Sequence, residues 1–348
     1  NKNTIGNLYG NFVGNMASAT YTYGGAIYNT GDIADINGYF IKNWIKGYTS
    51  YGGAIYNSGY IANINGDFIS NLNVGSSESS GGAIFNGGEI LNLKGDFIDN
   101  HTEGYENVYG GAINNFGSIG DIKGQYVANY VKSSSGYVEY YGAGGAISNL
   151  GTINSISADY YGNYVQANKG SNAYGGAIFN GAIIGTVDND GNVKNSIVNS
   201  SFIQNFATSD SIARGGAIYT SADLSLVAKD GYTSVFSGNY TISRGVKDDN
   251  AIAIRGKDVN LNFNMQSGGK FLIEDNIKVL GSDFRSYLAE LGLHDDPTET
   301  FLTISGNSSV QDFVESRGYE NVEEFLEDFG YSSFEEFLEI DACISLSF

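Results

Sequence analysis

The sequence of 348 residues contains one cysteine, Cys343, and one proline, Pro297. A single cysteine excludes an internal disulfide framework. A single proline beside 49 glycines argues against a disordered glycine-rich chain, because such chains are usually rich in proline as well. Hydrophobic residues make up 41% of the chain, which is enough for a continuous core. We therefore expect a folded protein that needs glycine at fixed positions.

Basic residues are also scarce, since 18 Lys and Arg stand against 38 Asp and Glu, and the formal net charge is −20. The basic residues form no cluster, so nucleic acids and anionic lipids would be repelled. No stretch approaches the roughly 18 consecutive apolar residues of a membrane-spanning helix. Residues 1–20 lack the basic start and apolar region of a secretory signal. We expect no nucleic-acid partner, no direct membrane insertion and a mature or trimmed N-terminus.

A repeat runs through most of the chain. Gly-Gly-Ala-Ile occurs seven times, at steps of 28, 29, 29, 34, 31 and 40 residues. A second motif, Phe/Tyr-x-x-Asn, alternates with the first, and a pair of Ile or Leu residues three apart lies between them. Copies of the two motifs include Gly24, Gly25, Ile27, Gly52, Gly53, Ile55, Gly81, Gly82 and Ile84, and Phe40, Asn43, Phe68, Asn71, Phe97 and Asn100.

Each repeat holds three short apolar segments separated by Gly, Asn and Ser, which predicts one coil of a parallel β-helix. We expect an all-β, right-handed solenoid with about one three-stranded coil per repeat. Helix is disfavoured in the Gly-Gly segment, because two glycines cost roughly 2 kcal/mol relative to alanine. A leucine-rich-repeat horseshoe needs a helical segment there, and a calcium-binding roll needs x-Gly-x-Asp after Gly-Gly. Neither alternative fits, and no metal or cofactor is expected.

Strand alternation places the isoleucines of Gly-Gly-Ala-Ile inward and the next residue outward. The outward column is an interrupted aromatic stripe that includes Tyr28, Tyr56 and Phe85. Gly-Gly is typical of a tight corner, and stacked asparagines after the motifs can hydrogen-bond to one another along the stack. We interpret the asparagines as structural. Phe40 and Ile41 cannot both face the core of a regular strand, and the sequence leaves open which one does.

Gly-Gly-Ala-Ile alternating with Phe-x-x-Asn resembles the repeats of the chlamydial polymorphic outer-membrane proteins and related type V autotransporter passengers. The resemblance covers residues 1 to about 280. It implies secretion behind a C-terminal translocator barrel, display on the bacterial surface, and adhesion to host cells or neighbouring bacteria. It carries over no catalytic residue. The residues after the repeats are too few for such a barrel, so we expect it to be absent from this chain.

The pattern changes after the repeats. We assign residues 1–260 to the β-helix, 261–306 to irregular last coils with a short helix at 282–291, and 307–348 to an acidic segment of three short helices. Gly318 and Gly330 mark helix ends, and Ser309, Asn321 and Ser333 are N-caps. Helices this short need a packing surface, so the sequence predicts a cap on the solenoid, with an acidic docking module as the alternative.

Catalysis is not expected. A secreted polysaccharide-degrading enzyme is the alternative function, because Asp67 and Asp96 would lie on neighbouring coils roughly 5 Å apart, near the spacing of a glycosidase pair. Every column of a solenoid has this spacing, however, and no basic group converges there. The chain also lacks a nucleophile elbow, a phosphate-binding loop and zinc-ligand spacing.

Adhesion is the expected function, with a surface glycan or protein of a host or bacterium as the partner. Insertions in repeat proteins collect on one face, often the binding face. The longest segment of variable length, from Tyr130 to Ala143, is predicted to be a loop with Tyr137, Glu139, Tyr140 and Tyr141 as candidate binding residues. Tyr28, Tyr56 and Phe85 are the second candidate surface. The same three loop tyrosines could instead fold back over the coil below.

Overall fold

The computed structural model describes residues 3–135, 140–168, 170–187, 193–194, 196–256, 259–280, 309–316, 319–329 and 332–334. The chain divides into two units. The first comprises Asn1–Ile254 and Val259–Lys278, and the second comprises Arg255–Asp258 and Val279–Phe348.

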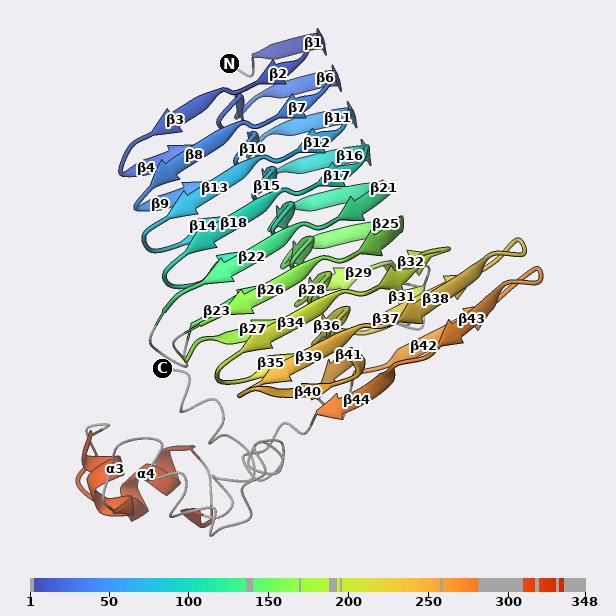
Figure 1. The fold of residues 1–348 in the computed structure, drawn as a ribbon. Coiled ribbons are helices and arrows are strands. Elements are labelled where there is room, and N and C mark those ends of the chain that lie inside the picture. The colour runs from blue at the N-terminus through green and yellow to red at the C-terminus, as the bar shows by residue number, and fades with distance from the viewer. Residues whose placement is uncertain are drawn as a thin grey trace. The chain divides into compact units, whose positions relative to one another are not determined.

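The first unit is a stack of coils built from four sheets, in which equivalent residues of successive repeats pair in register (Figure 1). Ile55, for example, pairs with Ile27 of the preceding repeat and Ile84 of the following one, all in parallel strands. The predicted parallel β-helix is confirmed, and the described residues between 20 and 240 contain no helix.

Sheet A contains the strands that begin each coil. They are β1 (Thr4–Tyr9), β2 (Phe12–Val13), β6 (Asp32–Asn37), β7 (Phe40–Ile41), β11 (Tyr60–Asn65), β12 (Phe68–Ile69), β16 (Glu89–Lys94), β17 (Phe97–Ile98), β21 (Ser118–Val127), β25 (Thr152–Tyr161), β29 (Ile183–Ile184), β32 (Ile197–Val198), β33 (Phe202–Ile203), β37 (Leu224–Ala228), β38 (Thr233–Ser237), β42 (Leu261–Met265) and β43 (Lys270–Ile273).

Sheets B and C follow Phe/Tyr-x-x-Asn in each repeat. Sheet B comprises β3 (Met16–Ser18), β8 (Trp44–Gly47), β13 (Leu72–Gly75), β18 (His101–Gly104), β22 (Tyr130–Ser133), β26 (Tyr164–Ala167), β34 (Phe206–Ser209), β39 (Tyr240–Ser243) and β40 (Val246–Asp248). Sheet C comprises β4 (Tyr21–Tyr23), β9 (Thr49–Tyr51), β14 (Ser79–Ser80), β19 (Val108–Tyr109), β23 (Tyr141–Ala143), β27 (Asn172–Tyr174) and β35 (Ala213–Arg214).

Sheet D contains the Gly-Gly-Ala-Ile strands. They are β5 (Ile27–Asn29), β10 (Ile55–Asn57), β15 (Ile84–Asn86), β20 (Ile113–Asn115), β24 (Ile147–Asn149), β28 (Ile178–Asn180), β36 (Ile218–Thr220), β41 (Asn250–Arg255) and β44 (Asn276–Leu280). We number the coils 1 to 8 by the strands from β5 to β41. A small antiparallel pair joins β30 (Thr186–Val187) to β31 (Val193–Lys194).

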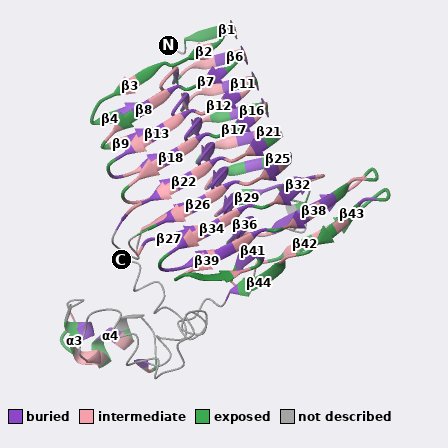
Figure 2. Ribbon diagram, viewed as in Figure 1, coloured by how far each residue is buried: buried purple, intermediate pink, exposed green. Residues whose placement is uncertain are grey.

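The main core lies between sheets A and D. Its isoleucines and aromatic rings repeat once per coil, and Ile33, Ile55, Phe40 and Ile84 are at most 2% exposed. Figure 2 shows buried residues in successive coils of the stack. A fully buried side chain of this size stabilises the fold by roughly 1.5–3 kcal/mol. Phe40, and not Ile41, faces the core, because Phe40 is fully buried and Ile41 is partly exposed. The question that the sequence left open is thereby answered.

A second, smaller core lies between sheets B and C. Val108, Val131, Val165 and Ala173 are completely buried there. The varying length of this part of each repeat predicted a loop. Two short strands form in coils 1 to 7, because most of the inward residues are small or apolar and can pack between the two sheets.

The Gly-Gly corner joins sheet C to sheet D. Gly81 adopts φ +72°, and a Cβ atom at Gly82 would lie 2.0 Å from the carbonyl oxygen of Gly111 in the next coil. Only glycine fits at both positions, because the first needs a left-handed conformation and the second lies against backbone.

Two buried asparagine ladders confirm the structural interpretation of these residues. Asn71 Nδ2 donates to Asn100 Oδ1 at 2.8 Å and to the Phe40 carbonyl at 2.8 Å, while its Oδ1 accepts from the backbone N–H and Nδ2 of Asn43. The second ladder runs from Asn29 along sheet D, where Asn57 Nδ2 donates to Asn86 Oδ1 at 2.8 Å. Each side-chain amide therefore forms hydrogen bonds with backbone groups at a corner of the coil and with the asparagine amide of the next coil.

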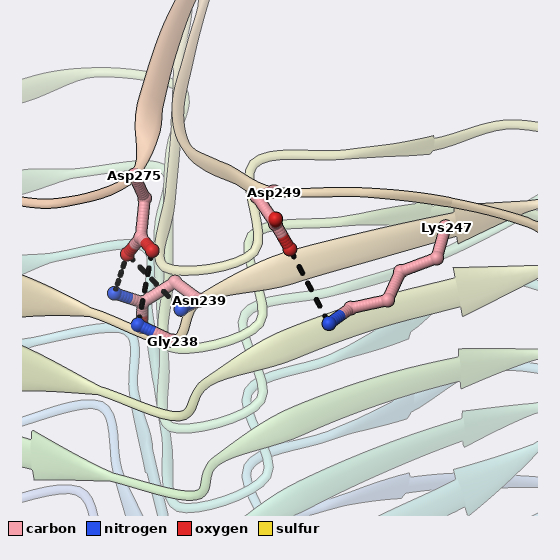
Figure 3. Close-up of polar contacts among 5 residues, drawn as sticks. All are labelled: Gly238, Asn239, Lys247, Asp249 and Asp275. Carbon is pink, nitrogen blue, oxygen red and sulfur yellow. Dashed lines mark hydrogen bonds and ion pairs between the residues drawn. The ribbon is translucent and has the colours of Figure 1, made fainter.

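The first ladder ends on a carboxylate. Asp275 accepts hydrogen bonds from the backbone N–H groups of Gly238 and Asn239 and from Asn239 Nδ2, at 2.7–3.0 Å (Figure 3). The nearby pair of Lys247 and Asp249, 3.3 Å apart, is exposed and contributes little. Asp275 is suited to the last position of the ladder because all three groups that face it are N–H donors, so only an acceptor is required there.

Tyr126 and Tyr160 interrupt the phenylalanines of the inner column, and their buried hydroxyls have no hydrogen-bond partner. Burial raises the pKa of both phenols well above its ordinary value. We expect Tyr126→Phe to stabilise the protein by about 1 kcal/mol, because it removes an unsatisfied buried group. Chemical denaturation measures this, with Tyr39→Phe at an exposed site as the control. A loss of stability in Tyr126→Phe would contradict the assignment.

The second unit contains α3 (Val310–Ser316) and α4 (Val322–Phe329). Ser309 Oγ accepts from the N–H of Asp312 and Asn321 Oδ1 from that of Glu324, which confirms two of the predicted N-caps. The rings of Phe313, Phe325 and Phe334 pack together. The predicted helix at 282–291, Gly318 and Gly330 lie outside the described residues, and the capping role stays a prediction.

Candidate binding surface

The described ends of the segment from Tyr130 to Ala143, residues 130–135 and 140–143, are not the loop that the sequence predicted. Its two ends form β22 and β23, which pair in parallel with β26 and β27 of the next coil. The loop prediction was wrong at these ends because the strands of sheets B and C continue through coils 1 to 7. Tyr137 and Glu139 lie outside the described residues.

The other two candidates in this segment lie against the coil. The Tyr140 carbonyl accepts from the N–H of Asn172 at 3.0 Å. The half-buried ring of Tyr141 lies 5.5 Å from Tyr109, whose hydroxyl donates to that of Tyr141, and 6.1 Å from Phe179. Tyr141 therefore belongs to the aromatic packing of the coils.

The stripe predicted to face outward from sheet D is exposed at Tyr28 and partly exposed at Tyr56, but the prediction is wrong for Phe85, which is buried because Tyr51 and Phe116 pack against its ring. The rings of the stripe stack along the solenoid axis. Tyr28 and Tyr56 lie 5.1 Å apart, and Tyr56 and Phe85 lie 5.3 Å apart, in near-parallel planes. Tyr23 and Tyr51 of sheet C pack against the same rings. We call these facing columns of sheets C and D the aromatic corner. Exposure falls along it, from 58% at Tyr28 to 9% at Phe85.

A longer column, which the sequence analysis missed, lies on the outer face of sheet B. We call it the front ladder. It has a large side chain in all eight coils, directly after the asparagine of Phe/Tyr-x-x-Asn: Met16, Trp44, Leu72, His101, Tyr130, Tyr164, Phe206 and Tyr240. Met16 is exposed and the others are partly exposed. This position in the repeat was the signal that could have revealed it.

The front ladder presents ring edges. From His101 to Tyr240, consecutive ring centroids lie 4.4–5.1 Å apart with interplanar angles of 1–11°. Each ring face is therefore covered by its neighbour, and the solvent contacts the edges and the tyrosine hydroxyls. Sugars stack on open ring faces, so this geometry is better suited to a protein surface.

The surroundings of the front ladder are nearly neutral. The outward residues two positions further along the same strands include Lys46, Glu103 and Lys132, which sum to +1 in a protein of net charge −20. Lys132 lies over the Tyr130 ring and 3.6 Å from Glu103. Burial, followed by the Glu103 carboxylate, raises the pKa of Tyr130, so its hydroxyl remains a donor at neutral pH.

The carboxylates that suggested an enzyme bind backbone groups. Asp67 Oδ1 accepts from the N–H of Asp96, and Asp96 Oδ1 accepts from that of Gln125 in the next coil, at 3.0 and 2.9 Å. Asp159 likewise accepts from Ser201 at 2.8 Å. These hydrogen bonds stabilise the bend that precedes the inner aromatic residue in the three coils concerned.

Within the described ranges, no group of three His, Cys, Asp or Glu side chains is arranged to hold a metal ion. The helices in the same ranges are too short or too polar to cross a membrane. No family model, curated protein or solved structure matches the chain.

Proposed function

We propose that the protein is a surface-displayed rod that acts in adhesion, and that the front ladder binds a protein on a host cell or neighbouring bacterium. The observation that carries the proposal is the unbroken column of large, partly exposed side chains over eight coils. Soluble proteins rarely leave extended apolar surfaces uncovered without a partner.

The chemistry of the front ladder favours a protein partner. Eight coils at about 4.8 Å per step present a row roughly 34 Å long, which matches the dimensions of an ordinary protein interface. Edge-on tyrosines at a rigid, regular spacing lose little side-chain freedom on binding, and their hydroxyls can donate to backbone carbonyls. The low local charge avoids the repulsion that the rest of the surface would impose on acidic proteins.

The test is a pair of charge substitutions, Leu72→Glu and Tyr164→Glu, in one variant. Both residues face outward, so the variant should melt within a few degrees of the wild type, while attachment of protein-coated beads to cells falls roughly tenfold or more. Leu91→Glu with Tyr39→Glu is the matched control, since both residues are exposed on sheet A or its turns. Protease treatment of the cells should also abolish attachment.

Two results would contradict the proposal. Attachment unchanged in the front-ladder variant would place the adhesive surface elsewhere, beginning with Tyr28 and Tyr56. Attachment that survives protease but is lost after glycosidase treatment would show that the partner is a glycan.

A further inference from the structure

The aromatic corner is interrupted in its middle. Along the outward column of sheet D, Phe85 of coil 3 and Phe179 of coil 6 flank two short polar residues, Asn114 and Ser148. The residue two positions further along the chain in each coil varies in the opposite way, since it is small after a ring and bulky after a short polar residue. Gly87 and Gly181 follow the two phenylalanines, whereas Phe116 and Leu150 follow Asn114 and Ser148. Two rings are thus missing from the column, and a bulky side chain two residues on is present in each of these coils.

The interruption leaves polar atoms without partners. Ser80 Oγ, Asn114 Nδ2, Asn114 Oδ1 and Ser148 Oγ are all buried and have no hydrogen-bond partner. Asn114 and Ser148 are completely inaccessible to solvent, so bulk water cannot satisfy them. Unsatisfied buried amides are strongly unfavourable, and the paired amides of the ladders show that this fold satisfies them elsewhere.

These atoms converge on one place. Rings of sheet C pack on the sheet D residue of the next coil, as Tyr51 does on Phe85 at 4.7 Å. Ser80 therefore stands where a ring would otherwise cover Asn114, and Tyr109 occupies the equivalent position for Ser148. Phe116 lies on the outer side, 47% exposed, with its centroid 5.9 Å from that of Phe85. A partly exposed ring thus lies two residues beyond the unsatisfied amide of Asn114.

The flanking rings can bind a flat molecule. Phe85 stacks on Tyr56 with an interplanar angle of 2°, and Phe179 stacks on Tyr219 with an angle of 5°. The opposite face of Phe85 points toward coil 4, whereas Leu150 lies beside Phe179, since a Cβ atom at Gly181 would be 2.9 Å from Leu150 Cδ2 and 3.1 Å from Phe179 Cε1. Rotation of Phe116 away from Phe85, whose centroid is 5.9 Å from its own, would free the ring of Phe85 for a ring-shaped ligand lying parallel to the column.

We propose that Ser80, Asn114 and Ser148 form the floor of a binding site for a neutral pyranose ring, with Phe85 as the stacking surface and Phe116 as the side chain that moves aside. A pyranose has an apolar C–H face for an aromatic ring and adjacent hydroxyls for the donor and acceptor of one amide. None of these side chains is charged, and the acidic protein disfavours an anionic sugar. This site is separate from the front ladder.

The repeat supplies the variants for a test. Phe116→Gly copies coils 3 and 6 and opens the site. Asn114→Phe with Phe116→Gly restores the regular column, fills the site and removes the unsatisfied amide. Binding is measured by saturation-transfer NMR and calorimetry with the methyl glycosides of glucose, galactose, mannose and N-acetylglucosamine, and with methyl glucuronide as the anionic comparison.

We expect the wild type to bind at least one neutral glycoside, Phe116→Gly to bind it roughly tenfold more tightly, and the double variant to lose binding while melting at the same or a higher temperature. The front-ladder variant should keep sugar binding, and the double variant should keep cell attachment, so each proposal can fail alone. Absence of neutral glycoside binding in the wild type, binding only of methyl glucuronide, or binding retained by the double variant would overturn the proposal.

Discussion

Replacing Ile84 with aspartate should lower the free energy of unfolding by about 4 kcal/mol or more. Ile84 is completely buried, and its strand neighbours in the main core are Ile55 and Ile113. An aspartate there would place an uncompensated carboxylate among apolar side chains. It would either stay charged at great cost or take up a proton and leave its polar atoms unsatisfied.

Thermal melting followed by circular dichroism measures the effect, and Leu91→Asp is the control. Leu91 is 40% exposed on sheet A and carries a side chain of similar size. The control should melt close to the wild type. Equal melting temperatures for Ile84→Asp and the wild type would refute the burial of Ile84 and the orientation of the whole column.

Replacing Asn71 with alanine should cost about 3 kcal/mol or more. The side chain makes four hydrogen bonds, two through Nδ2 and two through Oδ1, with partners in the coils on both sides. Its removal leaves the Phe40 carbonyl and the Asn43 N–H unsatisfied in a site that is completely buried. Each such group costs roughly 1–3 kcal/mol.

Asn65→Ala is the matched control for Asn71→Ala. Asn65 also donates to an asparagine of the neighbouring coil, at 3.2 Å, but it is exposed to water. Its replacement should change stability by less than about 0.5 kcal/mol. If the two alanine variants unfolded at the same denaturant concentration, the buried ladder would not be the stabilising element that the geometry indicates.

The core of the fold could be predicted because the repeat constrains it in every coil. One isoleucine and one aromatic residue recur in each turn of the chain, and strand alternation assigns them to the interior. The Gly-Gly corner and the asparagine ladders were predictable for the same reason, since a position that is glycine or asparagine in most coils reflects one local geometry repeated along the stack.

The candidate surfaces were less predictable. Segment length suggested loops between Phe/Tyr-x-x-Asn and Gly-Gly-Ala-Ile, yet short strands of Ser, Thr, Val and Ala pair there with their counterparts one coil away. The front ladder was visible in the sequence as a large residue after each asparagine. The exposure of the front ladder was not visible in the sequence, because Phe40 and Trp44 are both large. Only the path of the chain around Asn43 turns Phe40 inward and Trp44 outward.

The sequence by itself determined that the chain forms a parallel β-helix, which residues fill its main core, and that glycine and asparagine occupy its corners, because each of these properties repeats with the period of the coil. The tertiary structure alone decided which rings cover one another, which polar atoms at Ser80, Asn114 and Ser148 lack partners, and that sheets B and C enclose a second core. These properties depend on contacts between residues about 30 positions apart in the chain, and a column becomes a stacked ladder or an interrupted one only when successive coils are placed in register.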